Sequence, residues 1–460
     1  MADYTTPGVY IQEIPSNPPS VVSVPTAIPV FIGYTEKAIL KNTDDLLLVP
    51  QSIESMVEYE QYFGGPLLEN ITVTINTSIN PPVANASINP PSLYQMNYAL
   101  QLFFANGGGQ CYIVSTGNYS GGAIQLDNLQ RGLSNIETIN GITLIVFPDA
   151  LNMANAPDYY NLQNKALNQC GQLQDRFVIM DVFNDPAQNQ SGNLAALRNA
   201  LVGPNLKYGA AYFPQIRMEI NCVTDESKIL VVFLQNTSLN TTLDKLKSSN
   251  NDLYLLAQNA CEAGQSVLMS SSPAVAGAYV KIDSSQGVWK APANINLNQV
   301  ARIEVELTDA EQQIYNEDPV SGISVNVIRS FPGKGNATIW GASTLAGNDN
   351  DWRYIPIKRF FMMVEQSLKN AANQFIFEPN DENTWVRIQG MIETYLTSLW
   401  RQGSLSGAKP KDAFFVKVGL GVSMSAVDVM EGRMIIILGL AQVRPAEFII
   451  LEFTQLMQQN

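Results

Sequence analysis

One glycine-rich stretch of the sequence contains the residue types that bind phosphate. The segment "FPGKGNATIW" (331–340) places Lys334 between Gly333 and Gly335. A Walker A loop needs G-x-x-x-x-G-K-[ST], because its backbone N–H groups and its hydroxyl act together on phosphate and Mg²⁺, and here Lys334 is followed by Gly335 and Asn336. We therefore interpret the stretch as a tight turn between two strands, with no nucleotide or other cofactor bound.

Three acidic stretches contain the oxygen ligands that calcium prefers: "NTDD" (42–45), "NDND" (348–351) and "PNDEN" (379–383). None of them matches the twelve-residue EF-hand loop. Asp and Asn are also the residues that cap helices and form turns. We expect caps and turns at these positions, and no metal site.

Histidine is absent, and four cysteines are present. The absence of histidine excludes Ser-His-Asp and Cys-His nucleophile systems, H-E-x-x-H metal sites and imidazole proton shuttles. The cysteines (Cys111, Cys170, Cys222 and Cys261) lie far apart without C-x-x-C spacing, so we expect buried free thiols. No residue is predicted to be catalytic, and the chain is not expected to be an enzyme.

The net charge of −14 argues against nucleic-acid binding, which needs a basic surface. The charge is unevenly distributed. Residues 1–325 contain 14 Lys/Arg and 29 Asp/Glu, whereas residues 326–460 contain 13 and 12. This difference indicates two regions with different surroundings.

No membrane insertion is expected. The apolar run "MIIILGLAQV" (434–443) has half the length of about 20 residues that a spanning helix needs. The first residues lack a basic segment followed by an apolar one, as a secretory signal would have. We expect synthesis and folding in a bacterial cytoplasm.

The pattern of apolar residues predicts an α/β fold, with strands and helices alternating over most of the chain. Predicted strands include 27–38, 110–115, 141–150, 176–183 and 208–216, and predicted helices include 55–65, 93–105 and the segments after 150 and 190. Residues 66–92 are rich in Asn, Pro and Ser around one alternating stretch and are interpreted as a surface hairpin or loop insertion. Residues 271–297 have a pattern of small residues and turns.

A second α/β pattern covers the last 130 or so residues. A strand at 324–332 precedes a helix with one apolar face from Ile357 to Phe375, whose polar face includes Lys358 and Lys369. A further helix from Asn383 is predicted to bury one apolar face, made of Trp385, Ile388, Ile392, Leu396 and Leu399, and to end at Gly403. Strands follow at "AFFVKVG" and "GRMIIILGLAQV".

Both ends of the chain have strand-like sequences. Residues 1–29 contain six prolines, which exclude a stable helix, yet "GVYIQEI" is dense in β-formers. At the other end, "EFIILEFTQ" alternates apolar and polar residues as a half-buried edge strand does. Such segments need a sheet edge elsewhere, and that edge can belong to another molecule.

Several of these segments, in this order, resemble the contractile tail sheath proteins of bacteriophages and related contractile injection systems. They include "YTTPGVYIQEI", "FIGYTEKA", "FFANGGGQCYIV", "AGAYVKIDSSQGVWKAPAN", "VNVIRSFPGKGNATIWGASTL", "WRYIPIKRFFMMVEQSLKNAANQFIFEPND" and "GRMIIILGLAQVRPAEFIILEF". The resemblance extends over some 440 residues. Where the family often has paired arginines before the long helix, this chain has Lys358 and Arg359.

The resemblance implies a structural subunit with a conserved inner domain that faces a tube and a variable outer domain. The domains expected on this basis are an N-terminal extended arm (1–26), an outer α/β domain (27–325) with an insertion near 66–92, an inner domain (326–445) and a C-terminal strand arm (446–460). Such subunits polymerise as stacked hexameric rings around an inner tube and contract to drive it through a target envelope. The implied partners are further copies of the chain, the tube protein, and baseplate and terminal cap proteins.

The resemblance also implies which residues act in assembly. The inter-subunit arms are predicted to use the following residues: Tyr4, Val9, Tyr10, Ile11, Ile14, Phe448, Ile449, Ile450, Leu451 and Phe453. Predicted tube contacts are these five: Lys358, Arg359, Lys369, Lys409 and Lys411.

A second interpretation is a homo-oligomeric α/β enzyme or a carbohydrate-binding surface protein. Within the first, a phage tail, a bacteriocin and an extracellular injection particle all stay open, and overall similarity favours the last. The sequence does not separate a shaft subunit from one near the baseplate or cap.

Overall fold

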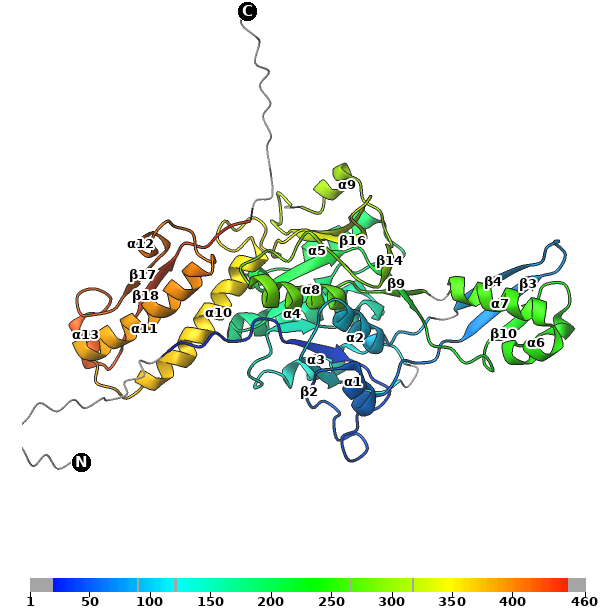
Figure 1. Ribbon diagram of the computed structural model, residues 1–460, viewed down its shortest axis with the longest axis horizontal. Helices are drawn as coiled ribbons and strands as arrows, with labels where there is room; N and C mark the ends of the chain where they lie inside the picture. The colour runs from blue at the N-terminus through cyan, green and yellow to red at the C-terminus, as the bar shows by residue number, and fades with distance from the viewer. Residues whose placement is uncertain (1–19, 89–90, 120–121, 265, 317, 446–460) are drawn as a thin grey trace, which may run out of the picture. The chain divides into compact units, whose positions relative to one another are not determined.

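The computed structural model describes residues 20–88, 91–119, 122–264, 266–316 and 318–445. The chain is mixed α/β and forms two compact units (Figure 1). The larger unit contains Pro25–Met363, and the smaller unit contains Val364–Val443 together with residues 20–24. The chain passes between the units after Val24 and again within helix α10 (Ile355–Ala372).

This division differs from the expected domain boundary at residue 326. Strand β15 (Val325–Phe331) pairs in parallel with β8 (Gly209–Phe213), and β16 (Gly335–Trp340) pairs with β15. Both strands therefore extend the main sheet of the larger unit. The uneven charge distribution did not indicate this pairing, because strand pairing depends on backbone hydrogen bonds and not on net charge.

A nine-stranded sheet forms the centre of the larger unit. Its strands, in spatial order, are β13 (Ile295–Asn296), β16, β15, β8, β7 (Phe177–Asp181), β6 (Leu144–Val146), β1 (Pro29–Gly33), β5 (Cys111–Ser115) and β2 (Gln51–Ile53). The strands from β15 to β5 run parallel. Within them, the order β5-β1-β6-β7-β8 is the 2-1-3-4-5 order of doubly wound folds.

Parallel strands covered on both faces are expected to be apolar throughout, and these strands are. All five residues of β1, β7 and β8 are buried. The connecting helices are α2 (Met96–Ala105), α3 (Leu126–Ser134), α4 (Ala156–Leu173), α5 (Gln190–Ala200) and α8 (Ser272–Gln286). Helix α2 packs against α8, whereas α4 packs against both α3 and α5. Right-handed crossovers place these two groups on opposite faces of the sheet.

Helix α8 corrects the interpretation of residues 271–297 as small residues and turns. Ala274, Ala276, Gly277 and Ala278 all lie in this helix and are buried. A Cβ atom at position 277 would overlap the carbonyl oxygen of Phe103 in α2. The small residues therefore allow the backbones of α2 and α8 to approach closely, which the sequence pattern alone did not indicate.

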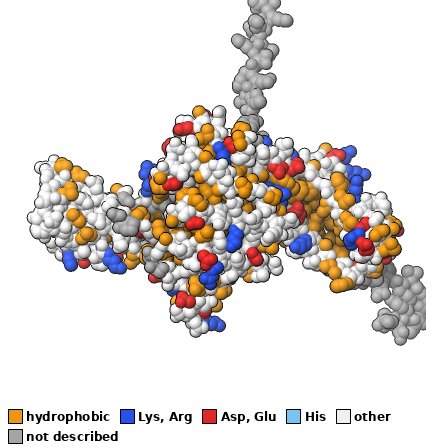
Figure 2. All heavy atoms as spheres, turned by 180° about the vertical axis from the view of Figure 1, so that it is seen from behind, with side chains coloured by type: hydrophobic (Ala, Val, Ile, Leu, Met, Phe, Trp, Pro, Cys, Tyr) orange, Lys and Arg blue, Asp and Glu red, His pale blue; other side chains and the backbone are white. Residues whose placement is uncertain are grey.

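The hairpin predicted within residues 66–92 is confirmed, since β3 (Ile71–Asn76) pairs antiparallel with β4 (Val83–Ile88). It belongs to a satellite, which we define as β3, β4, β10 (Leu230–Phe233), β11 (Thr241–Thr242), α6 (Leu243–Ser249) and α7 (Asn251–Gly264). Helix α7 packs on β3 and β4, and one end of the larger unit consists of this satellite (Figure 1). Its surface in Figure 2 is mostly white, as expected for uncharged polar side chains.

Several shorter elements complete the larger unit. They are α1 (Met56–Phe63), α9 (Asp309–Gln313), the short helices η1 (Ala150–Asn152), η2 (Leu206–Tyr208) and η3 (Thr237–Leu239), and a sheet of β12 (Ser266–Met269), β9 (Ile216–Asn221) and β14 (Val300–Ile303). The four cysteines are buried, as expected, and none of them is in a disulfide bond. Among the described residues, no helix has the length and apolar character needed to cross a membrane.

The smaller unit combines two long helices with a small sheet. Besides the second half of α10, it contains η4 (Asn373–Phe375), α11 (Glu382–Arg401), α12 (Pro410–Ala413), β17 (Phe414–Lys417), α13 (Ala426–Met430) and β18 (Ile437–Leu440). The predicted apolar face of α11 is buried at Ile388, Ile392, Leu396 and Leu399. Strands β17 and β18 pair antiparallel, and α11 packs on β17.

Replacement of Gly277 tests the close contact between α2 and α8. We expect Gly277→Ala to lower the free energy of unfolding by about 1–3 kcal/mol, because its methyl group would overlap the Phe103 carbonyl. Gly390→Ala in α11 is the matched control, since no atom lies within 4 Å of the position that its Cβ atom would take. This change should instead stabilise by up to about 1 kcal/mol through helix propensity. Urea unfolding of the unassembled protein measures both, and equal stabilisation by the two substitutions would contradict the packing argument.

Candidate functional site

Doubly wound sheets usually bind ligands beyond the carboxyl ends of their strands, where the strand order reverses. In this chain that point lies between β1 and β6. Asp149, just beyond β6, is fully buried there and accepts hydrogen bonds from the backbone N–H groups of Tyr34 (2.7 Å) and Gln95 (2.6 Å). Gln95 immediately precedes α2, so the carboxylate is used to cap this helix.

The next strand ends in the same way. Asp181 of β7 accepts hydrogen bonds from the backbone N–H of Ser271 (2.8 Å), from its hydroxyl (2.7 Å) and from the N–H of Ser272 (3.2 Å), where α8 begins. Burial raises the pKa of both aspartates, of Asp149 to about 7, against the lowering effect of these donors. Both carboxylates therefore fix helices of the chain itself and are not exposed to a substrate.

The glycine-rich stretch and the three acidic stretches that could have bound phosphate or calcium form turns and helix caps. Lys334 lies in the turn of the β15–β16 hairpin, where its N–H donates to the Phe331 carbonyl. Asp45 and Asp349 accept hydrogen bonds from backbone N–H groups of their own loops, and Asp381 caps α11. The predictions of turns and caps are confirmed. Within the described ranges, no group of three or more His, Cys, Asp or Glu side chains converges as a metal site does.

The expectation that Lys358 lies on an exposed polar face of its helix is wrong, and Arg359 is buried with it. Each side chain is 3% exposed. The Lys358 ammonium lies 4.2 Å from the ring centre of Tyr208 and 4.6 Å from that of Trp352, as in a cation–π contact. The first turns of α10 are buried on all sides. The sequence does indicate this, because Lys358 and Arg359 are flanked by apolar residues on both sides in "IPIKRFF", and a helix that is apolar all round is buried.

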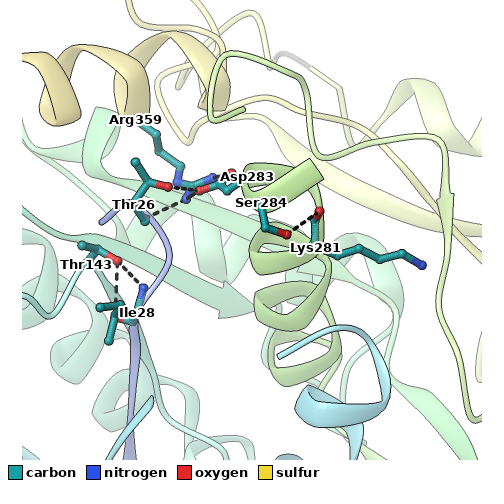
Figure 3. A network of polar contacts seen from close by, with 7 residues as sticks. All are labelled: Thr26, Ile28, Thr143, Lys281, Asp283, Ser284 and Arg359. Carbon is teal, nitrogen blue, oxygen red and sulfur yellow. Dashed lines mark hydrogen bonds and ion pairs between the residues drawn. The ribbon is translucent and has the colours of Figure 1, made fainter. Parts of the chain in front are cut away.

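Arg359 forms a bidentate ion pair with Asp283 of α8 (Figure 3). The distances are 3.1 Å from Nη1 to Oδ1 and 2.5 Å from Nη2 to Oδ2, and the two side chains are 3% and 5% exposed. Nη2 also donates to the Thr26 carbonyl (2.9 Å), and the Thr26 hydroxyl donates to Asp283 (2.6 Å). Thr26 follows the first passage of the chain into the larger unit, and Arg359 precedes the second. One ion pair therefore fixes both passages to α8.

The other three predicted tube-contact residues, Lys369, Lys409 and Lys411, are exposed on the smaller unit. All ten predicted arm residues lie outside the described residues. The end of the N-terminal segment is described, and it lies on the smaller unit. The Val24 N–H donates to the Ser367 hydroxyl (3.0 Å), and the Ser23 hydroxyl lies 3.0 Å from that of Tyr395.

The smaller unit exposes an unusual amount of apolar surface. On β17 and β18, Phe415 is 48% and Ile437 42% exposed, whereas Val416 on the opposite face is buried. The sheet consists of only these two strands among the described residues, and a two-stranded sheet is marginally stable by itself. Phe377 is fully exposed and has a φ of 72°, which bulky residues rarely adopt.

Exposed apolar residues and open strand edges are typical of surfaces at which proteins assemble. The buried titratable groups described above make contacts within the chain and do not indicate such a surface. Phe377, Phe415 and Ile437 were not predicted from the sequence. The sequence gives little indication of them, because an apolar residue in a short strand is normally expected to lie in the core. Only the structure shows that one face of this sheet is uncovered.

Comparisons with known proteins agree with an assembly role. The family described as "Phage tail sheath C-terminal domain" matches residues 347–455. The tail sheath protein of Vibrio phage KVP40 is 27% identical over 134 residues, which are 28% of this chain and 19% of the phage protein. This match therefore spans about a fifth of that protein.

Solved structures match over nearly the whole chain. The helical sheath of the anti-feeding prophage (AFP) in its contracted state is 30% identical and matches with a TM-score of 0.66 over 98% of this chain and 100% of that one. The chain belongs to the contractile tail sheath proteins. The contracted sheath of the extracellular contractile injection system PVC is 27% identical, with a TM-score of 0.66 over 99% of both chains. A chain of the AFP baseplate in its contracted state is 26% identical and matches with a TM-score of 0.71, over 98% of this chain and 99% of that one.

The family identified from the sequence is thus confirmed, and it is a structural family with no enzymatic activity. The matched chains come from a phage tail sheath protein, from the sheaths of PVC and AFP, and from the AFP baseplate. The use of Asp149 as a cap for a helix of the same chain agrees with a structural role.

The buried ion pair of this sheath protein should be important for stability. We expect Arg359→Met to lower the free energy of unfolding by about 3–5 kcal/mol, because Asp283 is left buried without its partner. The double variant Arg359→Met, Asp283→Asn should be less destabilised, since it buries no unpaired charge.

The control is Arg387→Met, which removes the exposed pair of Arg387 and Glu378 (3.2 Å) and should cost less than about 1 kcal/mol. Chemical denaturation of the unassembled protein measures all three variants. Similar small losses for Arg359→Met and Arg387→Met would show that the buried pair does not hold the segments together.

Proposed function

We propose that this protein polymerises as stacked six-membered rings around an inner tube and contracts to drive that tube through a target envelope. The observation that supports this most is the similarity of the whole chain to sheath subunits of particles in the contracted state. The likeness extends through the larger unit and is not confined to the matched C-terminal domain.

The partners are further copies of the chain, the tube protein, and baseplate and cap proteins. Matches to chains of the AFP baseplate support the association with a baseplate. The particle is a phage tail or a released extracellular contractile particle, and the similarity to PVC and AFP favours the second.

The terminal arms link neighbouring subunits by adding strands to the β17–β18 sheet. Both strands have an outer edge that no other described strand covers, and Phe415 and Ile437 expose apolar surface beside them. Each backbone hydrogen bond of an added strand contributes about 0.5–1.5 kcal/mol. Several such bonds hold a neighbour while the folded units rotate.

The smaller unit is the inner, tube-facing part, and the larger unit forms the outer part. The smaller unit is nearly neutral, with seven basic and eight acidic residues between 364 and 443, so it can approach a tube without strong repulsion. Lys369, Lys409 and Lys411 are the proposed tube contacts. No nucleotide or other cofactor acts during contraction, because the free-energy difference between the two sheath states is installed at assembly.

Removal of the N-terminal arm tests the proposed linkage. The purified full-length chain should form hollow tubes or stacked rings in negative-stain electron microscopy. Deletion of residues 1–19 should abolish these polymers and change the unfolding midpoint little, because the contacts of Ser23 and Val24 remain. Discrete small oligomers of the full-length chain would contradict the sheath function, and a large loss of stability would show that the arm belongs to its own subunit.

Charge reversal tests the tube contact. The triple variant Lys369→Glu, Lys409→Glu, Lys411→Glu should still polymerise but should lose co-assembly with the tube protein, which co-sedimentation measures. Lys245→Glu in the satellite is the control, since this residue is exposed and distant in sequence from all three. Unchanged co-sedimentation of the triple variant would exclude these lysines as the contact.

A further inference from the structure

The two edges of the nine-stranded sheet expose different side chains. Strands β13, β16 and β15 lie at one edge, and β2 lies at the other, followed directly by α1. Figure 1 shows α1 and β2 on the opposite side of the larger unit from β16 and α9. Nine strands at about 4.8 Å spacing separate the edges by roughly 40 Å.

The β15–β16 hairpin carries a cluster of aromatic and cationic side chains, which we call the hairpin cluster: Phe331, which is half-buried, and Lys334 and Trp340, which are exposed. The two rings lie 4.7 Å apart, and the Lys334 ammonium lies 5.5 Å from the first ring centre and 4.6 Å from the second. Trp340 is 38% exposed. Tryptophan held in place by neighbours and open to solvent is typical of binding hot spots.

The charge of the hairpin cluster comes from Lys334. Arg329 on the same hairpin is paired with Asp309 (2.6 Å), so its charge is offset. Lys334 forms no ion pair with any residue in the described part of the chain. Residues 326–340 contain no acidic residue.

The opposite edge is acidic and also exposes apolar side chains. Residues 36–61 contain six acidic and two basic residues. Asp44, Glu54 and Glu60 are exposed, and Val57 of α1 is 74% exposed. The N–H of Ile39 donates to the Tyr62 carbonyl (2.9 Å), which holds the loop after residue 38 beside α1. We call this surface the acidic edge.

We propose that the hairpin cluster of one copy docks on the acidic edge of the next copy. The proposal rests on the self-assembly stated under "Proposed function" and adds a contact between the folded units, separate from the terminal arms. The two surfaces have opposite charge, and each offers exposed apolar side chains. Because they lie at opposite edges of one sheet, they cannot meet within a single chain.

The geometry of this contact is heterologous, since a different surface of each copy takes part. Heterologous contacts produce rings if the rotation closes and helical polymers if it does not. A ring or helix is the form that a sheath requires, whereas a self-complementary contact would stop at a dimer. The charged part of the contact sets orientation, and the aromatic part contributes affinity.

Charge exchange tests the contact. Lys334→Glu should raise the critical concentration for polymerisation about tenfold, and Trp340→Ala by at least as much. Combining Lys334→Glu with Glu54→Lys and Glu60→Lys should restore polymerisation, because the signs are then exchanged. Lys245→Glu is the matched control and should leave the critical concentration unchanged. A Lys334→Glu variant that polymerises as the parent does, or that is not rescued, would overturn the proposal.

Site-directed cross-linking gives an independent measurement. The four native cysteines are buried, so cysteines introduced at Lys334 and Glu60 react selectively with a short bismaleimide. The double variant should give a ladder of covalent oligomers, and a mixture of the two single variants should give dimers, whereas cysteines at Lys245 and Glu60 should give neither.

Polymers that form normally but give no ladder would show that this contact is wrong while the sheath function holds. Absence of polymers from the parent chain would instead overturn the proposed function, and the contact with it.

Discussion

The ion pair between Arg359 and Asp283 holds two segments that are distant in sequence to one helix of the larger unit. Two segments distant in sequence enter the larger unit beside it, one through Thr26 and one through α10, and both are hydrogen-bonded to α8. Since α8 also packs against α2 and the central sheet, a force on either segment is passed to the core of the larger unit and not to a surface loop.

Internal contacts also occupy the carboxyl ends of the central strands. Asp149 and Asp181 lie at positions at which related folds bind substrates or cofactors, yet their oxygens accept hydrogen bonds from helix N-termini of the same chain. Asp149 also excludes a larger residue at position 33, because a Cβ atom there would lie against its carboxylate. Helices of the chain itself therefore occupy the strand ends at which a doubly wound sheet would otherwise bind a ligand.

Local pattern predicted much of this fold. Apolar runs such as "PVFIG" and "RFVIMDVF" indicated buried strands, and the apolar face of α11 and the turn at Gly333 were identified correctly, because each depends on neighbours in sequence. The incorrect predictions concern residues whose structure depends on contacts with residues distant in sequence. Helix α8 was missed because its small residues matter only against α2, and Lys358 was assigned to the surface because Tyr208 and Trp352 come from elsewhere in the chain. The domain boundary predicted at residue 326 was too early, because β15 pairs with β8 and so belongs to the larger unit, which extends to Met363. No local sequence pattern indicates this pairing.

The four buried thiols have a consequence for the redox chemistry of an assembled particle. Burial raises the pKa of Cys111, Cys170 and Cys222, the last to about 11, so the reactive thiolate is scarce at neutral pH. Disulfide exchange needs a thiolate that can reach a partner. Copies of this sheath protein that meet under oxidising conditions are therefore not joined at random by disulfide bonds through these buried thiols.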